Sequence, residues 1–550
     1  MEQRNLIMAI VLSVSILLGF QIFIEAPRLE KERAAGEAQK AQETNRAVQT
    51  GAPGAAPPAA TAPDIPRTAP PNGATAPVAG QPPVAPKIAR EKVLSAFPRV
   101  KISTNRVIGS IRLKGALIDD LTLLNYRQTI EKDSPNIVLL SPLNTENPYY
   151  AQFGWVSQTA SITVPDADTV WTADRETLSV GSPVTLRWSN PEGVEFSQVI
   201  SLDRNFMFSV RQQVKNGSSK SITLNPYGLI SLTGTPETSG FWILHEGMTG
   251  AFDGTLLEES YSTLQDEDDG LIAPDGQSNW IGITAKYFAT ALVPDQKTEN
   301  KGRWVHNAPR GATEKYQADY LASANVLGPG QTGEYATRLF AGAKEVRLLD
   351  SYRDGLGLPV FDKLVDFGWF YYLTKPIFYA IEYFNRILGN FGLAILLLTV
   401  LIKIVFFPLA NKSYRSMSRL KKLQPKMVEI RDRYKDDRQR QNQAMMDLYK
   451  KEGANPMSGC FPILIQIPVF FALYKVLFVT IEMRHAPFFG WIQDLSAPDP
   501  LGILTVFGLV PWDVPQVLMI ANIGIWPIIM GLTMFLQQKL NPQPADPMQA

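Results

Sequence analysis

The residues of this sequence best suited to chemistry are polar side chains inside apolar segments. Lys403 lies in the run GLAILLLTVLIKIVFFPL, which ends at Leu409, and a lysine at the centre of a membrane helix costs about 2.5 to 3.5 kcal/mol. Thr399 precedes it by one helical turn on the same face, and Gln466 is a polar residue in a later apolar run. Lys403, Thr399 and Gln466 are therefore candidates to line a shared polar cavity.

The lysines also have an interpretation that needs no cavity. Lys403 is about 9 Å along a helix from Leu409, so its side chain can snorkel to the cytoplasmic surface. The sequence is equally compatible with this alternative. Lys475 lies about two helical turns from the outer end of its own apolar run, and we expect it to snorkel outward.

Composition excludes several kinds of site. One cysteine, Cys460, and three scattered histidines (His245, His306 and His485) predict neither a metal site nor a cofactor. Fifty-three Lys and Arg against 52 Asp and Glu exclude a purely electrostatic nucleic-acid binder, and we expect no sequence-specific nucleic-acid partner. Residues 96–360 contain no Gly-x-Ser-x-Gly, Ser-x-x-Lys, His-Glu-x-x-His or phosphate-loop motif, so we predict that the protein is not an enzyme.

Four apolar segments predict a multi-span α-helical membrane protein. Leu6 to Ile24 is 19 residues without a charge, long enough to cross a bilayer. We interpret residues 1–27 as an uncleaved anchor rather than a cleaved signal peptide, because no small-residue cleavage site follows. Further spans are expected at about 391–409, 460–481 and 520–538.

Loop charges predict the orientation of these spans. Residues 412–451 contain 13 Lys or Arg and five Asp or Glu, whereas residues 482–513 contain one Arg and four acidic residues. The first loop is therefore expected in the cytoplasm and the second outside. The N-terminus is then cytoplasmic, and the long segment between the first two spans lies in a bacterial periplasm.

The exported segment divides into a linker and a folded domain. Residues 28–95 are expected to form an Ala/Pro-rich disordered tether, since 22 of the 36 residues from Gly51 to Pro86 are Ala or Pro. Residues 96–360 contain short runs in which apolar and polar residues alternate, such as Val184 to Trp188. This pattern predicts a large antiparallel β-sandwich.

Two amphipathic regions flank the second span. Residues 361–390 carry apolar residues at helical spacing and predict an interfacial helix, with an ordinary packed helix as the alternative. Residues 412–452 are expected to form a cytoplasmic helical hairpin with a narrow apolar seam. Its positive charge favours contact with anionic lipids or with ribosomal RNA.

Several short motifs carry a family resemblance. They are Leu-Gln-Pro-Lys at 423–426, Gly-Ala-Asn-Pro at 453–456, Gly-Cys-Phe-Pro at 459–462, Gln-Ile-Pro at 466–468 and Glu-Met-Arg-His-Ala-Pro at 482–487. In these motifs the sequence resembles the YidC-type membrane protein insertases. The resemblance covers most of the chain, including the anchor, the exported domain and the membrane core at 391–550.

This resemblance implies a function and a site. Lys403 stands where the family has the basic residue of a hydrophilic groove, and Thr399 and Gln466 match positions that line it. The implied protein inserts and chaperones nascent membrane proteins in the Gram-negative inner membrane, alone or with the Sec translocon, and contacts the ribosome. Its exported domain is expected to have a supersandwich fold.

The sequence departs from the family pattern at its C-terminus, and two other functions stay open. The family core has five spans after the exported domain, whereas this chain has three, so we expect it to lack the last two spans and one wall of the groove. The alternatives are a membrane-anchored periplasmic glycan- or peptide-binding protein and a small-solute transporter. A transporter usually has repeated halves, which this sequence lacks.

Overall fold

The computed structural model describes most of the chain after the expected tether. The described residues are 75–78, 88–240, 243–308, 313–435, 437–453, 461–510 and 521–540, with isolated positions between 511 and 520. The anchor expected at 1–27 and most of the tether lie outside them. Within the tether range, helix α3 (Arg90–Ser95) is formed and Ala76 packs in an apolar cluster with Leu117 and Tyr227.

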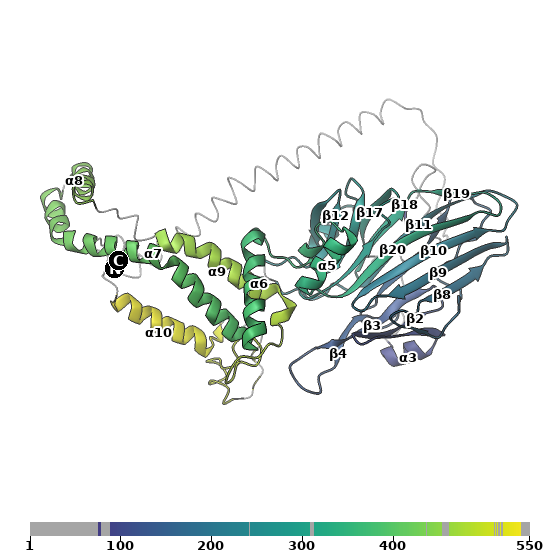
Figure 1. Ribbon diagram of the computed structural model, residues 1–550, viewed down its shortest axis with the longest axis horizontal. Helices are drawn as coiled ribbons and strands as arrows, with labels where there is room; N and C mark the ends of the chain where they lie inside the picture. Colours follow the sequence, from purple (N-terminus) through teal and green to yellow (C-terminus); the bar gives the residue numbers. More distant parts are fainter. Residues whose placement is uncertain are drawn as a thin grey trace, which may run out of the picture. The chain divides into compact units, whose positions relative to one another are not determined.

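Two β-sheets make up the domain expected at 96–360 (Figure 1). The first sheet has 11 strands: β1 (Arg99–Ser103), β2 (Val107–Arg112), β3 (Leu117–Arg127), β4 (Asn136–Leu140), β5 (Tyr149–Ser157), β7 (Thr177–Leu178), β11 (Ile222–Thr233), β14 (Leu271–Ile272), β17 (Asn300–Asn307), β18 (Lys315–Ala322) and β19 (Asn325–Leu327). The second has nine: β6 (Thr172–Ala173), β8 (Val184–Ser189), β9 (Val194–Leu202), β10 (Met207–Asn216), β12 (Gly247–Phe252), β13 (Thr255–Ser260), β15 (Ser278–Thr284), β16 (Phe288–Val293) and β20 (Thr332–Ala343).

Strand pairing is antiparallel except between β1 and β7. The burial of β9 alternates residue by residue, with Val194, Phe196, Ile200 and Leu202 facing the core, as the period of two requires. The prediction of a large antiparallel β domain is confirmed. One inward position of β9 is occupied by a polar residue, Gln198. Its burial is compensated by a hydrogen bond of 2.8 Å that its amide donates to the carbonyl oxygen of Phe153 in β5.

Short helices connect this domain to the apolar part of the chain. They are α5 (Val346–Leu356), η2 (Phe361–Leu364) and α6 (Tyr371–Leu388), whereas α4 (Tyr261–Asp266) lies between β13 and β14 within the β domain. Lys375 in α6 contacts Asp350 of α5 and Asp362 of η2, each at 2.5 Å. This ion-pair cluster fixes the start of α6 against the end of the β domain.

The helix expected over 361–390 is shorter than predicted. It begins at Tyr371, after the N-cap residue Phe370, and ends at Leu388, because Gly389 adopts the left-handed conformation that stops a helix at its C-terminus. Ile377 and Ile381 of the predicted apolar stripe are buried, whereas Leu388 is exposed. The stripe therefore packs against protein only in its first half.

The remaining helices are α7 (Phe391–Arg433), α8 (Arg438–Lys451), α9 (Phe461–Val479), η4 (Ile481–Met483) and α10 (Ile525–Leu540). Among the described residues, Phe391–Leu420 is the one helix long and apolar enough to cross a membrane, and Leu464–Val479 and Ile525–Gln537 are shorter apolar helices. No break separates the span expected at 391–409 from the hairpin expected at 412–452, since α7 continues through Pro408 and Pro425 to Arg433.

The described residues form two compact units. One contains the β domain, α5, α6, the first turns of α7 and residues 467–501. The other contains residues 402–466 and the chain after Leu501. In this second unit, Leu423 and Met427 of α7 are buried against Met445, Leu448 and Tyr449 of α8, so a helical hairpin is formed along the predicted seam.

Candidate polar site

The structure brings two of the three predicted site residues together. The Lys403 Nζ atom lies 3.4 Å from Gln466 Oε1, which is long for a hydrogen bond between these groups. Lys403 is exposed and Gln466 is partly exposed. Among the described residues, no carboxylate lies within ion-pair distance of Lys403. The ammonium is thus held loosely by a neutral amide and keeps its charge available.

Thr399 makes a different contact. Its hydroxyl donates to the carbonyl oxygen of Ile395, one turn earlier in α7, at 2.8 Å. The hydroxyl proton is therefore used within the helix, and only the oxygen lone pairs remain for an external donor. Thr399 is partly exposed and lies one turn before Lys403, as the spacing predicts.

Apolar side chains surround the polar pair. Ile404, Val405 and Phe407 on α7 and Leu464 on α9 are all exposed. An exposed apolar surface of this kind is unfavourable in water and suits lipid. Lys403 and Gln466 therefore form a polar contact next to exposed apolar side chains, and a lysine in this setting can attract an anion.

Lys475 corrects the expectation of outward snorkelling. Its side chain is only 2% exposed and its Nζ atom forms an ion pair with Asp366 Oδ2 at 3.0 Å. The same ammonium donates to the carbonyl oxygens of Asp366 and Ile243. The charge of Lys475 is neutralised by a partly buried carboxylate rather than by water. One feature of the sequence could have indicated this partner, namely the acidic residue Asp366 at the start of the aromatic segment 366–372.

Glu482, the first residue of the Glu-Met-Arg-His-Ala-Pro motif, is a second charged residue with a distant partner, and the sequence analysis assigned it no role of its own. Its Oε1 atom accepts a hydrogen bond from the backbone N–H of Val346, the first residue of α5, at 2.9 Å. Its Oε2 atom is buried without a partner among the described residues. Burial, the largest cause, and the neighbouring Glu345 and Glu382 together raise the pKa of Glu482 to about 7.

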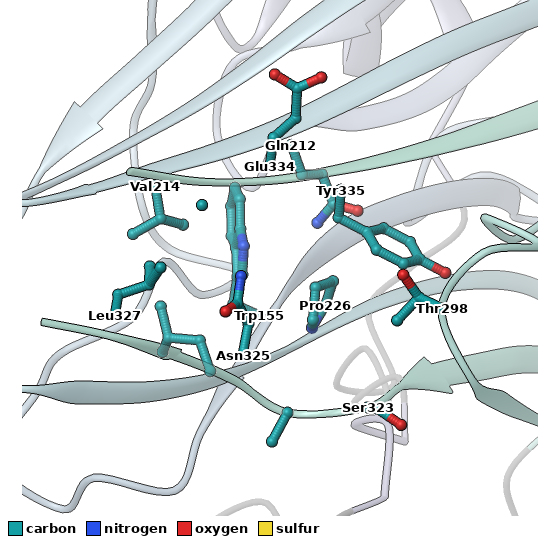
Figure 2. Close-up of a pocket in the computed structure, with 13 residues that line it drawn as sticks. Trp155, Gln212, Val214, Pro226, Thr298, Ser323, Asn325, Leu327, Glu334 and Tyr335 are labelled. Atoms are coloured by element: carbon teal, nitrogen blue, oxygen red, sulfur yellow. The ribbon is translucent and has the colours of Figure 1, made fainter. Parts of the chain in front are cut away.

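The β domain contains a cavity of about 250 Å³. In the view of Figure 2 the Trp155 indole stands between Val214 and Leu327 on one side and Pro226 and Tyr335 on the other. Gln212 also lines the cavity, donates to the carbonyl oxygen of Gly154 at 2.8 Å, and has an Oε1 atom without a partner among the described residues. The lining of this cavity is mainly apolar.

Metal chemistry finds no support in the part of the chain that the structure describes. No group of three His, Cys, Asp or Glu side chains there is placed to hold an ion. The three histidines lie apart, since His245 contacts the carbonyl oxygen of Met248, His306 contacts Glu314 and His485 faces Asp494.

Two family models match the chain. The model of the YidC periplasmic domain matches residues 99–380, and the model of the 60Kd inner membrane protein matches residues 383–550. Together they cover the β domain and the apolar helices.

Curated relatives match over the whole chain. The chain is 48% identical over 561 residues to a "Membrane protein insertase YidC" of Methylorubrum extorquens (strain PA1), with 100% of this chain and 88% of that protein covered. It is 48% identical over 554 residues to the protein of the same name from Beijerinckia indica subsp. indica, with 100% and 89% covered. The corresponding protein of Rhizobium meliloti (strain 1021) is 46% identical over 552 residues, with the same coverage of 100% and 89%.

Proposed function

The chain belongs to the YidC family of membrane protein insertases, and from this premise we propose that Lys403 and Gln466 form the contact point over which polar tails of nascent membrane proteins cross the inner membrane. Family membership gives an inner-membrane protein with a periplasmic domain. The observation that carries the proposal is the loosely held, exposed Lys403 ammonium in an apolar surface. The names of the three relatives support neither a transporter nor an envelope-binding protein.

The proposed mechanism needs no nucleotide. The hydrophobic segment of a substrate gains free energy by entering lipid, whereas its polar tail must cross an apolar layer. A hydrophilic groove lined by Lys403, Thr399 and Gln466 shortens that layer, and the ammonium attracts acidic residues of the tail. The membrane potential assists, because a negative charge that moves outward gains about 2.3 kcal/mol per 100 mV.

The proposed topology has several membrane crossings around the periplasmic domain. We place the anchor at 1–27, with the N-terminus in the cytoplasm, and further spans along α7, α9 and α10. The apolar character of these helices supports this arrangement, as does the charge difference between residues 412–451 and 482–513. The α7–α8 hairpin is then cytoplasmic.

The proposed partners follow from charge and family membership. The basic α7–α8 hairpin is available to anionic lipids and to ribosomal RNA. The Sec translocon is proposed as a cooperating partner on family membership alone. Substrates with short polar tails need no partner in this mechanism, since the groove and the membrane potential supply the driving force.

The test compares two substitutions of one residue. Lys403→Arg keeps the positive charge and is expected to retain insertion of a substrate with an acidic tail, whereas Lys403→Glu repels that tail and is expected to reduce its insertion about tenfold or more. Insertion is measured by protease protection of the substrate in proteoliposomes that contain the full chain.

The matched control is Lys412→Glu, which makes the same charge change at an exposed position of α7. Equal insertion by Lys403→Glu and Lys403→Arg would contradict the proposal. Site-specific crosslinking from positions 399, 403 and 466 to a stalled nascent chain gives an independent measurement, and contact with the substrate is expected from all three.

A further inference from the structure

A second, polar cavity lies beside the Glu-Met-Arg-His-Ala-Pro motif, which the proposed insertion mechanism does not use. Its volume is about 460 Å³. Nine residues line it, and none of them is acidic: Asn125, Tyr126, Arg127, Thr129, Ile130, Arg484, His485, Pro487 and Gln493. Two arginines without a lining acid indicate a site for an anion.

The two arginines are held in place by neutral groups. Arg484 Nη2 donates to the carbonyl oxygens of Arg127 at 2.7 Å and Gln128 at 3.0 Å. Arg127 Nη1 donates to the carbonyl oxygens of Lys132 at 2.7 Å and Ser134 at 2.9 Å. Carbonyl oxygens fix the two guanidinium groups without neutralising them. Among the described residues, neither arginine has a carboxylate within ion-pair distance.

Two acidic residues next to lining residues have other partners: Glu345, which accepts from Tyr126, also pairs with Arg106, and Asp494 is the second. Asp494 Oδ1 accepts hydrogen bonds from the backbone N–H groups of His485 at 3.0 Å and Ser496 at 2.8 Å, and from the Ser496 hydroxyl at 2.7 Å. Its Oδ2 atom lies 3.9 Å from His485 Nε2. Burial lowers the pKa of Arg484 from its ordinary value, so an anion in the cavity would offset the desolvation of this cation.

The backbone at the motif is strained. His485 has φ of 60°, a left-handed conformation that is costly for a residue with a Cβ atom. The hydrogen bond from its N–H to Asp494 holds this turn. The turn lets the consecutive residues Arg484 and His485 both line the cavity, although neighbours in an extended chain point to opposite sides.

The rim of the cavity has the character of a membrane interface. The motif follows the apolar helix Leu464–Val479 within five residues. Ile130, which lines the cavity, is exposed, as are Phe489 and Trp491, which lie in the sequence between the lining residues Pro487 and Gln493. Aromatic side chains of this kind concentrate at the depth of lipid headgroups. A phosphate group at this depth belongs to a phospholipid rather than to the bulk solution.

We propose that this cavity binds the headgroup of an anionic phospholipid, phosphatidylglycerol, with the phosphate on Arg127 and Arg484. A zwitterionic headgroup carries an ammonium, and no lining residue is an acid that would receive it. A glycerol headgroup carries hydroxyls instead, for which Asn125, Thr129 and Gln493 are suitable partners. The inference goes beyond the insertion mechanism and does not depend on Lys403.

The experiment titrates the detergent-purified full chain with short-chain phosphatidylglycerol and counts bound lipid by native mass spectrometry. Arg484→Gln and Arg127→Gln are each expected to weaken binding about fivefold. Arg484→Lys, which keeps the charge, is expected to retain most of the affinity. The control Arg187→Gln makes the same charge change at an exposed position of β8, outside the cavity lining, and should leave binding unchanged.

Three results would overturn the proposal. Equal binding of short-chain phosphatidylcholine would remove the headgroup assignment. Displacement of the lipid by inorganic phosphate at matching concentration would make the cavity a site for free phosphate. Equal affinities of Arg484→Gln, Arg127→Gln and Arg187→Gln for phosphatidylglycerol would exclude the cavity as the lipid-binding site. If Arg484→Gln lowers the unfolding temperature, Arg127→Gln decides the outcome, because that guanidinium holds only its own loop.

Discussion

Two lysines in apolar helices show that the role of a residue in this protein depends on its partner in the fold. Lys403 and Lys475 look alike in the sequence, since each interrupts an apolar run. In the structure Lys403 meets a neutral amide at 3.4 Å, whereas Lys475 is buried against Asp366. The carboxylate partner, 109 residues away along the chain, is supplied by long-range packing. It makes Lys475 a structural cation, whereas Lys403 has no carboxylate within ion-pair distance among the described residues.

The Lys475–Asp366 pair gives a stability prediction. Asp366→Asn is expected to lower the free energy of unfolding by about 3 kcal/mol, because breaking a buried ion pair leaves an uncompensated charge. Adding Lys475→Met to that variant should recover part of the loss, since an apolar side chain of similar size suits the buried position. Thermal unfolding of the full chain in detergent measures both. Asp268→Asn, in an exposed turn, is the control, and an equal effect of the two Asp substitutions would refute the prediction.

Among the elements, the start of α5 has an unusual partner. Its N-cap residue, Glu345, makes no side-chain capping bond, because its carboxylate contacts Arg106 and Tyr126 instead. Glu482 from η4 supplies the acceptor for Val346 N–H. The β domain and the end of the apolar helix α9 are thus joined by a carboxylate at a helix N-terminus, where a negative charge is favourable.

This junction predicts a pH dependence opposite to that of an ordinary ion-paired carboxylate. The pKa of Glu482 is raised to about 7 from 4.5, so between these values the folded state binds a proton that the unfolded state releases. The contribution to stability is complete below pH 4.5 and is lost as pH rises through 7, by at most about 3 kcal/mol.

Glu482→Gln isolates this contribution. The difference in unfolding free energy between the parent and Glu482→Gln should change between pH 5 and pH 8, with the parent losing more stability at the higher pH. Glu237→Gln, at an exposed position, should show no such difference. A pH-independent gap between the parent and Glu482→Gln would show that Glu482 keeps the same protonation state throughout this range.

The seam between α7 and α8 gives a prediction for another element. Leu423→Ala removes a buried side chain from a cluster that includes Met427 and Leu448 and is expected to cost about 2 kcal/mol locally. Amide exchange in α8 should accelerate, while exchange in the β domain should stay unchanged. Val428→Ala, at an exposed position of the same helix, is the control. Equal exchange rates in α8 for the two variants would argue against the seam.

For the whole molecule, the local pattern of apolar residues predicted the features that depend on neighbouring residues, namely strands and helix faces. The period-two runs predicted the strands of 96–360, and the apolar spacing predicted that Leu423 and Met427 face a second helix. The partners of Lys475 and Glu482 escaped prediction because they depend on long-range packing. The continuity of α7 was not predicted for another reason. Pro408 and Pro425 suggest breaks in a helix, but a helix can bend around a proline when its neighbours support it. Gln466 was predicted beside Lys403 because both are polar interruptions of apolar runs.

The continuity of α7 has a mechanical consequence. Leu423 packs against α8 and lies in the same helix as Lys403, 20 residues later. At 3.6 residues per turn, the directions of these two side chains around the helix axis differ by about 160°. The helix is continuous between these two residues. A rotation of the hairpin about the axis of α7 is therefore expected to turn the Lys403 side chain as well, so the packing of α8 on α7 helps to set the direction in which this ammonium points.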